Sequence, residues 1–186
     1  MCDSLLLTVA ACFLTADFIT GLVHWVEDTY GVPSWPVLGK FVVEPNIEHH
    51  LHPQLVATMS HFVLRNYQAI VPCLTVALLV LLWIGWNAWP VALTLGIASL
   101  GNEVHAWNHS SQNNWVIKFL QNSGLVQSPR QHAKHHRPPF DAYFCTLLNI
   151  TNEVLEILQF WRRLEWFLHV SFGVSPKRMT VERQGV

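Results

Sequence analysis

The chain has 186 residues, of which 51% are hydrophobic and only 12% charged, whereas soluble domains are usually about one quarter charged. A formal net charge of -1 gives no reason to expect a nucleic-acid partner. The four cysteines lack the spacing of a thiolate metal site or a disulfide framework. The length fits one domain covering 1–186, and its eleven histidines and nine tryptophans are unusual counts.

The first long apolar run covers residues 5–26 and would be about 33 Å long as a helix, enough to cross a bilayer. It has no basic segment before it and contains Asp17 and His24, so we interpret it as a membrane span rather than a signal peptide. Its polar residues share one face, at spacings of 4, 3 and 4: Asp17, Gly21, His24 and Asp28. Because a carboxylate facing lipid is costly, we expect Asp17 to face the bundle. There it either holds a neighbouring helix, with Asn102 as the natural partner, or lines a channel.

A polar connection, 29–67, follows the first span and contains the segment Glu44–Pro53. The prolines of this segment can open and close a short helix, because proline is tolerated in a first turn and ends a helix further on. His49 and His50 crowd this helix, and His61 follows it.

Two further apolar runs, 68–86 and 91–108, are predicted as the second and third spans. Tryptophans surround the turn between them, as in an aromatic belt at a membrane surface: Trp83, Trp86 and Trp89. The third run ends in His105 and His109, which share one helical face with Asn102.

The densest group of histidines lies in residues 128–139, which read Ser-Pro-Arg-Gln-His-Ala-Lys-His-His-Arg-Pro-Pro. Ser128 can cap a helix, Pro129 then takes its first position, and the two later prolines end it. Three imidazoles at i, i+3 and i+4 share one face: His132, His135 and His136. This pattern predicts metal ligands, and the alternative is a basic surface helix.

These elements predict an all-α membrane helical bundle of about three spans with a histidine-rich di-metal cap. Two crossings separate the ends of the first and third spans, so both ends lie on the same side as the cap, 29–67 and 109–170. Within the cap, 151–170 is predicted as an amphipathic helix, and 171–186 as a polar tail. All eleven Lys and Arg residues fall on this side, which the positive-inside rule makes cytosolic. We expect an integral protein of the endoplasmic reticulum in a eukaryote, or of the inner membrane in a bacterium.

Nine histidines occur in pairs or clusters and are the candidate metal ligands: His24, His49, His50, His61, His105, His109, His132, His135 and His136. Their number exceeds the need of one zinc ion and suits two metal ions with about six coordination positions each. Imidazole-rich sites without thiolates favour iron, with zinc and copper as the alternatives. Asp28 and Asn102 are further candidates, as ligands or as groups that orient a ligand. His52 and His169 are expected outside the site.

A metal site at the end of an apolar bundle indicates a lipid substrate. Iron with O2 can attack an unactivated C–H bond, because the metal rather than the protein supplies the oxidising power. The sequence contains no haem or flavin motif, so the electrons are expected from a separate carrier protein. We predict no catalytic residue apart from the metal ligands.

Several motifs resemble the Kua family of lipid desaturases, and the resemblance covers about residues 16–178. They are Ala-Asp-Phe-Ile-Thr-Gly-Leu-Val-His-Trp from residue 16, Glu-His-His from 48, His-Ala-Trp-Asn-His from 105, Arg-Gln-His-Ala-Lys-His-His from 130 and Phe-Trp-Arg-Arg-Leu-Glu from 160. The resemblance implies a single lipid desaturase domain with two iron ions held by the nine histidines. It also implies O2 as co-substrate, a membrane phospholipid as substrate, and a cytochrome b5-like or ferredoxin-like electron donor.

The family includes plasmanylethanolamine desaturases, which form the vinyl ether of plasmalogens, and a plant chloroplast enzyme that places a trans double bond at carbon 3 of an acyl chain in phosphatidylglycerol. The run from Arg130 resembles the plant branch, and the run from Phe160 resembles the plasmanyl branch. We expect the plasmanyl reaction, with the trans-3 reaction and a hydroxylase on the same scaffold as alternatives. A non-catalytic membrane metal carrier or sensor is the alternative of another class. Transport is disfavoured, because only Asp17 lies deep in a span.

Overall fold

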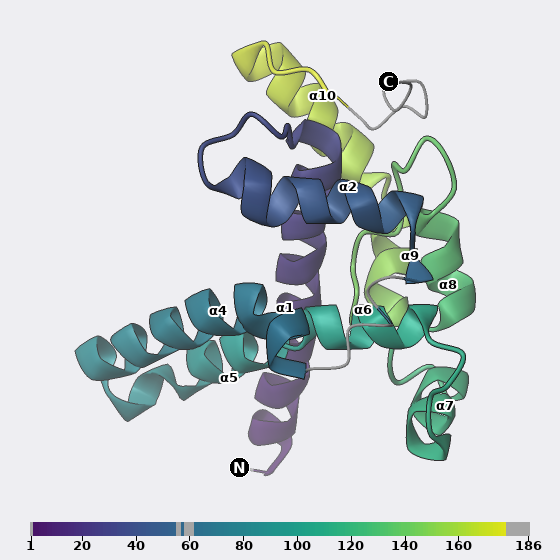
Figure 1. Cartoon of the computed structure of the whole chain (residues 1–186). Coiled ribbons are helices and arrows are strands. Elements are labelled where there is room, and N and C mark those ends of the chain that lie inside the picture. The colour runs from purple at the N-terminus through teal and green to yellow at the C-terminus, as the bar shows by residue number, and fades with distance from the viewer. Residues whose placement is uncertain (1, 55–56, 58–61, 178–186) are drawn as a thin grey trace.

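A computed structural model describes residues 2–54, 57 and 62–177, which form helices and connections without a strand (Figure 1). The elements in chain order are α1 (Cys2–Tyr30), the π-helical turn η1 (Gly39–Val43), α2 (Glu44–Leu51), α4 (Phe62–Ile84), the 3-10 turn η2 (Trp86–Ala88), α5 (Trp89–Ala98), α6 (Gly101–His109), α7 (Trp115–Asn122), α8 (Pro129–His135), α9 (Asn149–Ile157) and α10 (Phe160–Phe172). The predicted all-α class is confirmed for the described residues.

Two described helices are long and apolar enough to cross a membrane, α1 over Asp3–Tyr30 and α4 over Arg65–Ile84. They contain the predicted spans 5–26 and most of 68–86. The side chains of Leu82 and Trp83 on α4 are 74% and 87% exposed. Apolar surface of this kind is costly in water but not in lipid, so the outer face of α4 suits a bilayer.

The run 91–108, predicted as the third span, is not one continuous helix. It breaks between α5 and α6, where the Ser99 hydroxyl donates a hydrogen bond to the Gly96 carbonyl at 2.7 Å. At ten residues, α5 is about 15 Å long, half the thickness of the hydrocarbon core. α5 packs against α1 and α4, whereas α6 stays in contact with α4 and extends to α8 (Figure 1).

The predicted amphipathic helix 151–170 is also two helices, α9 and α10. They are separated at Gln159, whose backbone φ of 50° lies in the left-handed region and ends α9. The two helices cover the end of α1 through a buried aromatic core, in which Trp161 stacks on Trp25 with ring centroids 5.7 Å apart. The Trp25 indole also donates to the Glu165 carboxylate at 3.2 Å.

Candidate metal centre

α1 brings His24 and Asp28 to the site one helical turn apart, on the face that carries Gly21. A Cβ at Gly21 would lie 2.5 Å from the Cys145 Sγ, so only glycine lets the segment 144–147 approach the helix this closely. The approach places the Phe144 carbonyl 3.2 Å from His24 Nδ1, which donates to it. The Nε2 atom of His24 is thereby directed towards Asp28, with its Oδ2 atom 3.5 Å away.

The predicted helix in Glu44–Pro53 is confirmed as α2, which ends before His52, but Pro45 does not open it, because η1 runs into α2 without a break. Its two neighbouring histidines are both buried, and their rings point to different groups of ligands. The His49 Nε2 faces His105 and His136, while the His50 Nε2 faces Asp28 at 3.1 Å.

The second predicted short helix is confirmed as α8. The Ser128 hydroxyl accepts a hydrogen bond from the Gln131 backbone N–H at 3.3 Å, and Pro129 takes the first helical position. Behind the helix, the buried Asn152 amide donates to the Gln131 side chain at 3.1 Å and thus fixes the rotation of α8. That rotation directs His132, His135 and His136 inward.

The larger group of ligand atoms comes from α2, α6 and α8, and its atoms all lie within 4.8 Å of one another: His49, His105, His109, His132 and His136. Their Nε2 atoms face each other in a chain of contacts between 2.8 and 3.2 Å long. A neutral imidazole nitrogen either donates one hydrogen or accepts one, so at most two of these four contacts can be hydrogen bonds. Hydrogen bonds alone therefore cannot pair all five nitrogens, whereas one metal ion bound by imidazoles can.

The smaller group comes from α1, α2 and α8, and its ligand atoms also lie within 4.8 Å of one another: His24, Asp28, His50 and His135. His135 Nδ1 donates to the Ala142 carbonyl at 2.9 Å, as His24 Nδ1 does to Phe144, so both neutral rings present a lone pair on Nε2. These Nε2 atoms and the Asp28 Oδ2 are buried without a hydrogen-bond partner among the described residues. Two lone pairs and a carboxylate oxygen that face one another likewise fit a metal ion.

Burial keeps the histidines of the larger group in the neutral form that binds metals. Desolvation and the neighbouring imidazoles lower the pKa of His49 to about 2 and that of His109 to about 4. The same causes hold the pKa values of His132 and His136 well below the ordinary 6.5. At neutral pH these rings therefore have free lone pairs and need not release protons to bind a cation.

Comparison with known proteins identifies the family. The family model described as the lipid desaturase domain matches residues 13–179. The chain belongs to the lipid desaturase family. A plasmanylethanolamine desaturase of Myxococcus xanthus is 30% identical over 94% of this chain, plasmanylethanolamine desaturase 1 of Mus musculus is 33% identical over 92%, and the chloroplastic fatty acid desaturase 4 of Arabidopsis thaliana is 31% identical over 89%.

The chain spans 64% of the length of the Myxococcus relative, 68% of the mouse relative and 52% of the Arabidopsis relative. No solved structure matches it.

Eight of the nine histidines predicted as ligands in this lipid desaturase chain lie in the two groups, and Asp28 joins the smaller one. The ninth, His61, lies outside the described residues. His52 is largely exposed beside Glu48, and His169 bonds Ser175 at the far end of α10. Neither belongs to the two groups.

The two polar residues Asp17 and Asn102 lie outside both groups and do not pair with each other. Asp17 is fully buried, and its Oδ1 accepts a hydrogen bond from the Leu147 backbone N–H at 2.7 Å. The Asn102 amide instead donates to the Arg65 carbonyl at 3.3 Å. The expectation that Asp17 faces the bundle is confirmed, and the backbone N–H that it holds belongs to the irregular segment after residue 144.

Supporting residues around the site were missed from the sequence. The Asn46 amide donates to Asp28 Oδ1 at 2.6 Å, and its position four residues before His50 was the available signal. Arg65 forms a two-pronged ion pair with Glu103, with a shortest distance of 2.7 Å, and so joins α4 to the histidine-bearing α6. Nothing in the sequence spacing relates these two residues, because they lie 38 positions apart.

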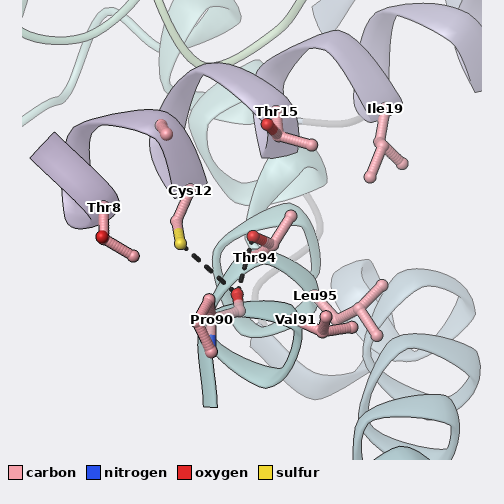
Figure 2. Close-up of a pocket in the computed structure, with 9 residues that line it drawn as sticks. Thr8, Cys12, Thr15, Ile19, Pro90, Val91, Thr94 and Leu95 are labelled. Carbon is pink, nitrogen blue, oxygen red and sulfur yellow. Dashed lines mark hydrogen bonds between the residues drawn. The ribbon is translucent and has the colours of Figure 1, made fainter. Parts of the chain in front are cut away.

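A separate apolar groove of about 340 Å³ lies between α1 and α5. Figure 2 shows side chains from both helices along it, including Thr15 and Ile19 of α1 and Leu95 of α5. At 100° per residue, His24 lies about 140° around α1 from Ile19. The groove and the candidate metal centre therefore occupy different faces of α1, and Asp17 does not line this groove.

Proposed function

We propose that this chain is the desaturating domain of a membrane enzyme that uses two iron ions and O2 to introduce a double bond into a phospholipid chain. The observation that carries the proposal is the pair of adjoining, thiolate-free histidine groups. α2 and α8 each contribute ligands to both groups, so the two groups form one rigid unit. Bound iron would supply the power to oxidise an unactivated C–H bond with O2.

The proposed reaction balances with an external electron source. Two adjacent carbons of the lipid chain each lose one hydrogen, O2 accepts these together with two electrons and two protons from a donor, and two water molecules form. The chain's own residues prepare the site for this chemistry. Carbonyls of the segment 142–144 hold the rings of His24 and His135, and Asn46 holds the Asp28 carboxylate.

For the substrate, we propose an ether-linked phospholipid whose alkyl chain is converted to a vinyl ether. Two of the relatives, from Myxococcus xanthus and Mus musculus, carry the name plasmanylethanolamine desaturase. The Phe-Trp-Arg-Arg-Leu-Glu run that resembles this branch has a defined place in the fold, since Trp161 and Glu165 both contact Trp25 next to His24. We further propose that the site faces the cytosol.

Lipid analysis of cells that lack vinyl ether lipids and express this chain tests the proposal. A vinyl ether product is expected with the unaltered protein and none with His135→Ala, while His52→Ala serves as the matched control because His52 stands outside both groups. Purified protein should contain about two iron ions per chain. A trans-3 acyl product, a hydroxylated lipid, or stoichiometric zinc without iron would each contradict a stated part of the proposal.

A further inference from the structure

We propose that the outer face of α8 is the docking surface for an acidic one-electron carrier protein that reduces the metal centre. The inference rests on the proposed function, which requires two external electrons in each turnover. It concerns the residues on the side of α8 opposite its histidines, which belong to neither group of metal ligands.

The two sides of α8 differ sharply in chemistry. His132 and His135 are 1% and 0% exposed and face the metal groups. The residues at i, i+3 and i+4 lie on the opposite side of α8: Arg130, Ala133 and Lys134. Arg137 follows directly after the C-cap residue His136 and is also exposed. These four residues are called the outer stripe. The outer stripe thus carries three cationic side chains. The small Ala133 lies between them and leaves their charged groups accessible to a partner.

Most of this positive charge is uncompensated. Lys134 pairs with Glu153 at 3.1 Å and with the Tyr143 hydroxyl at 3.0 Å. The side chains of Arg130 and Arg137 are exposed and have no ion pair or hydrogen bond within the described part of the chain. An acidic protein surface is the complementary partner for such a stripe, and charge attraction would speed its encounter.

The position of α8 suits electron delivery. α8 contributes His132 to the larger group and His135 to the smaller one, and its C-cap residue His136 joins the larger group. A helix with its side chains is about 10 Å across, so a carrier seated on the outer stripe would lie within one helix width of both groups. α2 also contributes to both groups, but it exposes Glu44 and Glu48 and would repel an acidic carrier.

A protein partner fits this face better than an anionic membrane surface does. Helices that lie in a membrane interface combine basic residues with exposed aromatic and large aliphatic side chains. α7 has that character, with Trp115 79% and Phe119 61% exposed. The segment 128–139 exposes no large hydrophobic side chain, so the stripe on α8 offers charge without an inserting group.

The test uses the purified, metal-loaded full chain in neutral-lipid nanodiscs with a cytochrome b5 haem domain as the carrier. Binding is measured directly by surface plasmon resonance, and turnover is measured with either this carrier or a small-molecule reductant. Arg130→Glu with Arg137→Glu should weaken carrier binding and raise the KM for the carrier about tenfold at low salt, with a smaller effect at high salt. Turnover with the small-molecule reductant should not change.

Two further variants sharpen the result. Arg130→Gln with Arg137→Gln should give an intermediate loss, because it removes charge without reversing it. Glu44→Gln with Glu48→Gln, the matched control on α2, should leave carrier binding unchanged or strengthen it.

Three binding outcomes would overturn the proposal: unchanged carrier binding in the charge-reversed variant, weaker binding in the α2 control, or an effect that depends on anionic lipid and not on carrier. An equal loss of turnover with the small-molecule reductant would also overturn it. If the unaltered chain gives no lipid product with either reductant, the proposed function fails instead, while the binding measurement still judges the docking surface.

Discussion

Substituting Gly21 with alanine tests how closely α1 must approach the segment 144–147. The added Cβ would lie 2.5 Å from Cys145 Sγ and 3.1 Å from the Cys145 backbone nitrogen. Because Cys145 is fully buried, the backbone of this segment has to move. Overpacking of this kind costs about 1–3 kcal/mol, against a gain of about 0.5–1 kcal/mol from replacing glycine within a helix.

The net expectation for Gly21→Ala is a loss of up to about 2.5 kcal/mol in the free energy of unfolding. The same shift would disturb the Phe144 carbonyl that orients His24. Thermal melts in detergent and elemental analysis measure both effects. Gly96→Ala is the matched control, since a Cβ there meets no atom within 4 Å and alanine should stabilise α5. Equal stabilisation and full metal content in the two variants would refute the reasoning.

Three further perturbations separate the parts of the site. Asp28→Asn should lower the bound metal from about two ions per chain to about one, because Asp28 belongs to the smaller group alone; retention of both ions would contradict this. Gln127→Leu should cost about 1–3 kcal/mol, since the buried Asn108 amide would lose its acceptor and the Cys145 carbonyl would keep only the Asn152 amide, and an unchanged melting temperature would contradict it. Chelator-treated protein should lose stability as the pH falls from 6.5 to about 4. In this range His109 binds a proton in the unfolded chain but not in the folded protein, so protons favour unfolding. A melting temperature that does not change with pH across this range would argue against this.

Local sequence signals predicted the two short histidine helices well. Ser128 and Pro129 determine where α8 begins, and Pro45 lies in the first turn of α2, so the facing direction of the histidines follows from helical spacing. The same signals overestimated helix length elsewhere. The run 91–108 was predicted as one span, yet it divides at Ser99 and Leu100. Its first half, α5, is apolar and packs against α1 and α4, whereas α6 carries polar residues and contacts α4 and α8.

The sequence by itself determined the all-α class, two long apolar helices and the set of histidines that carries the candidate site, because these depend on composition and on spacing within single helices. Only the tertiary structure decided how the ligands divide. His49 and His50 are adjacent in the chain but serve different groups, and Asp28 joins His135 across more than one hundred residues. It also decided that Asp17 holds the Leu147 backbone rather than Asn102. Such pairings depend on the relative rotation and approach of separate helices, which packing at positions such as Gly21 fixes and which no local pattern encodes.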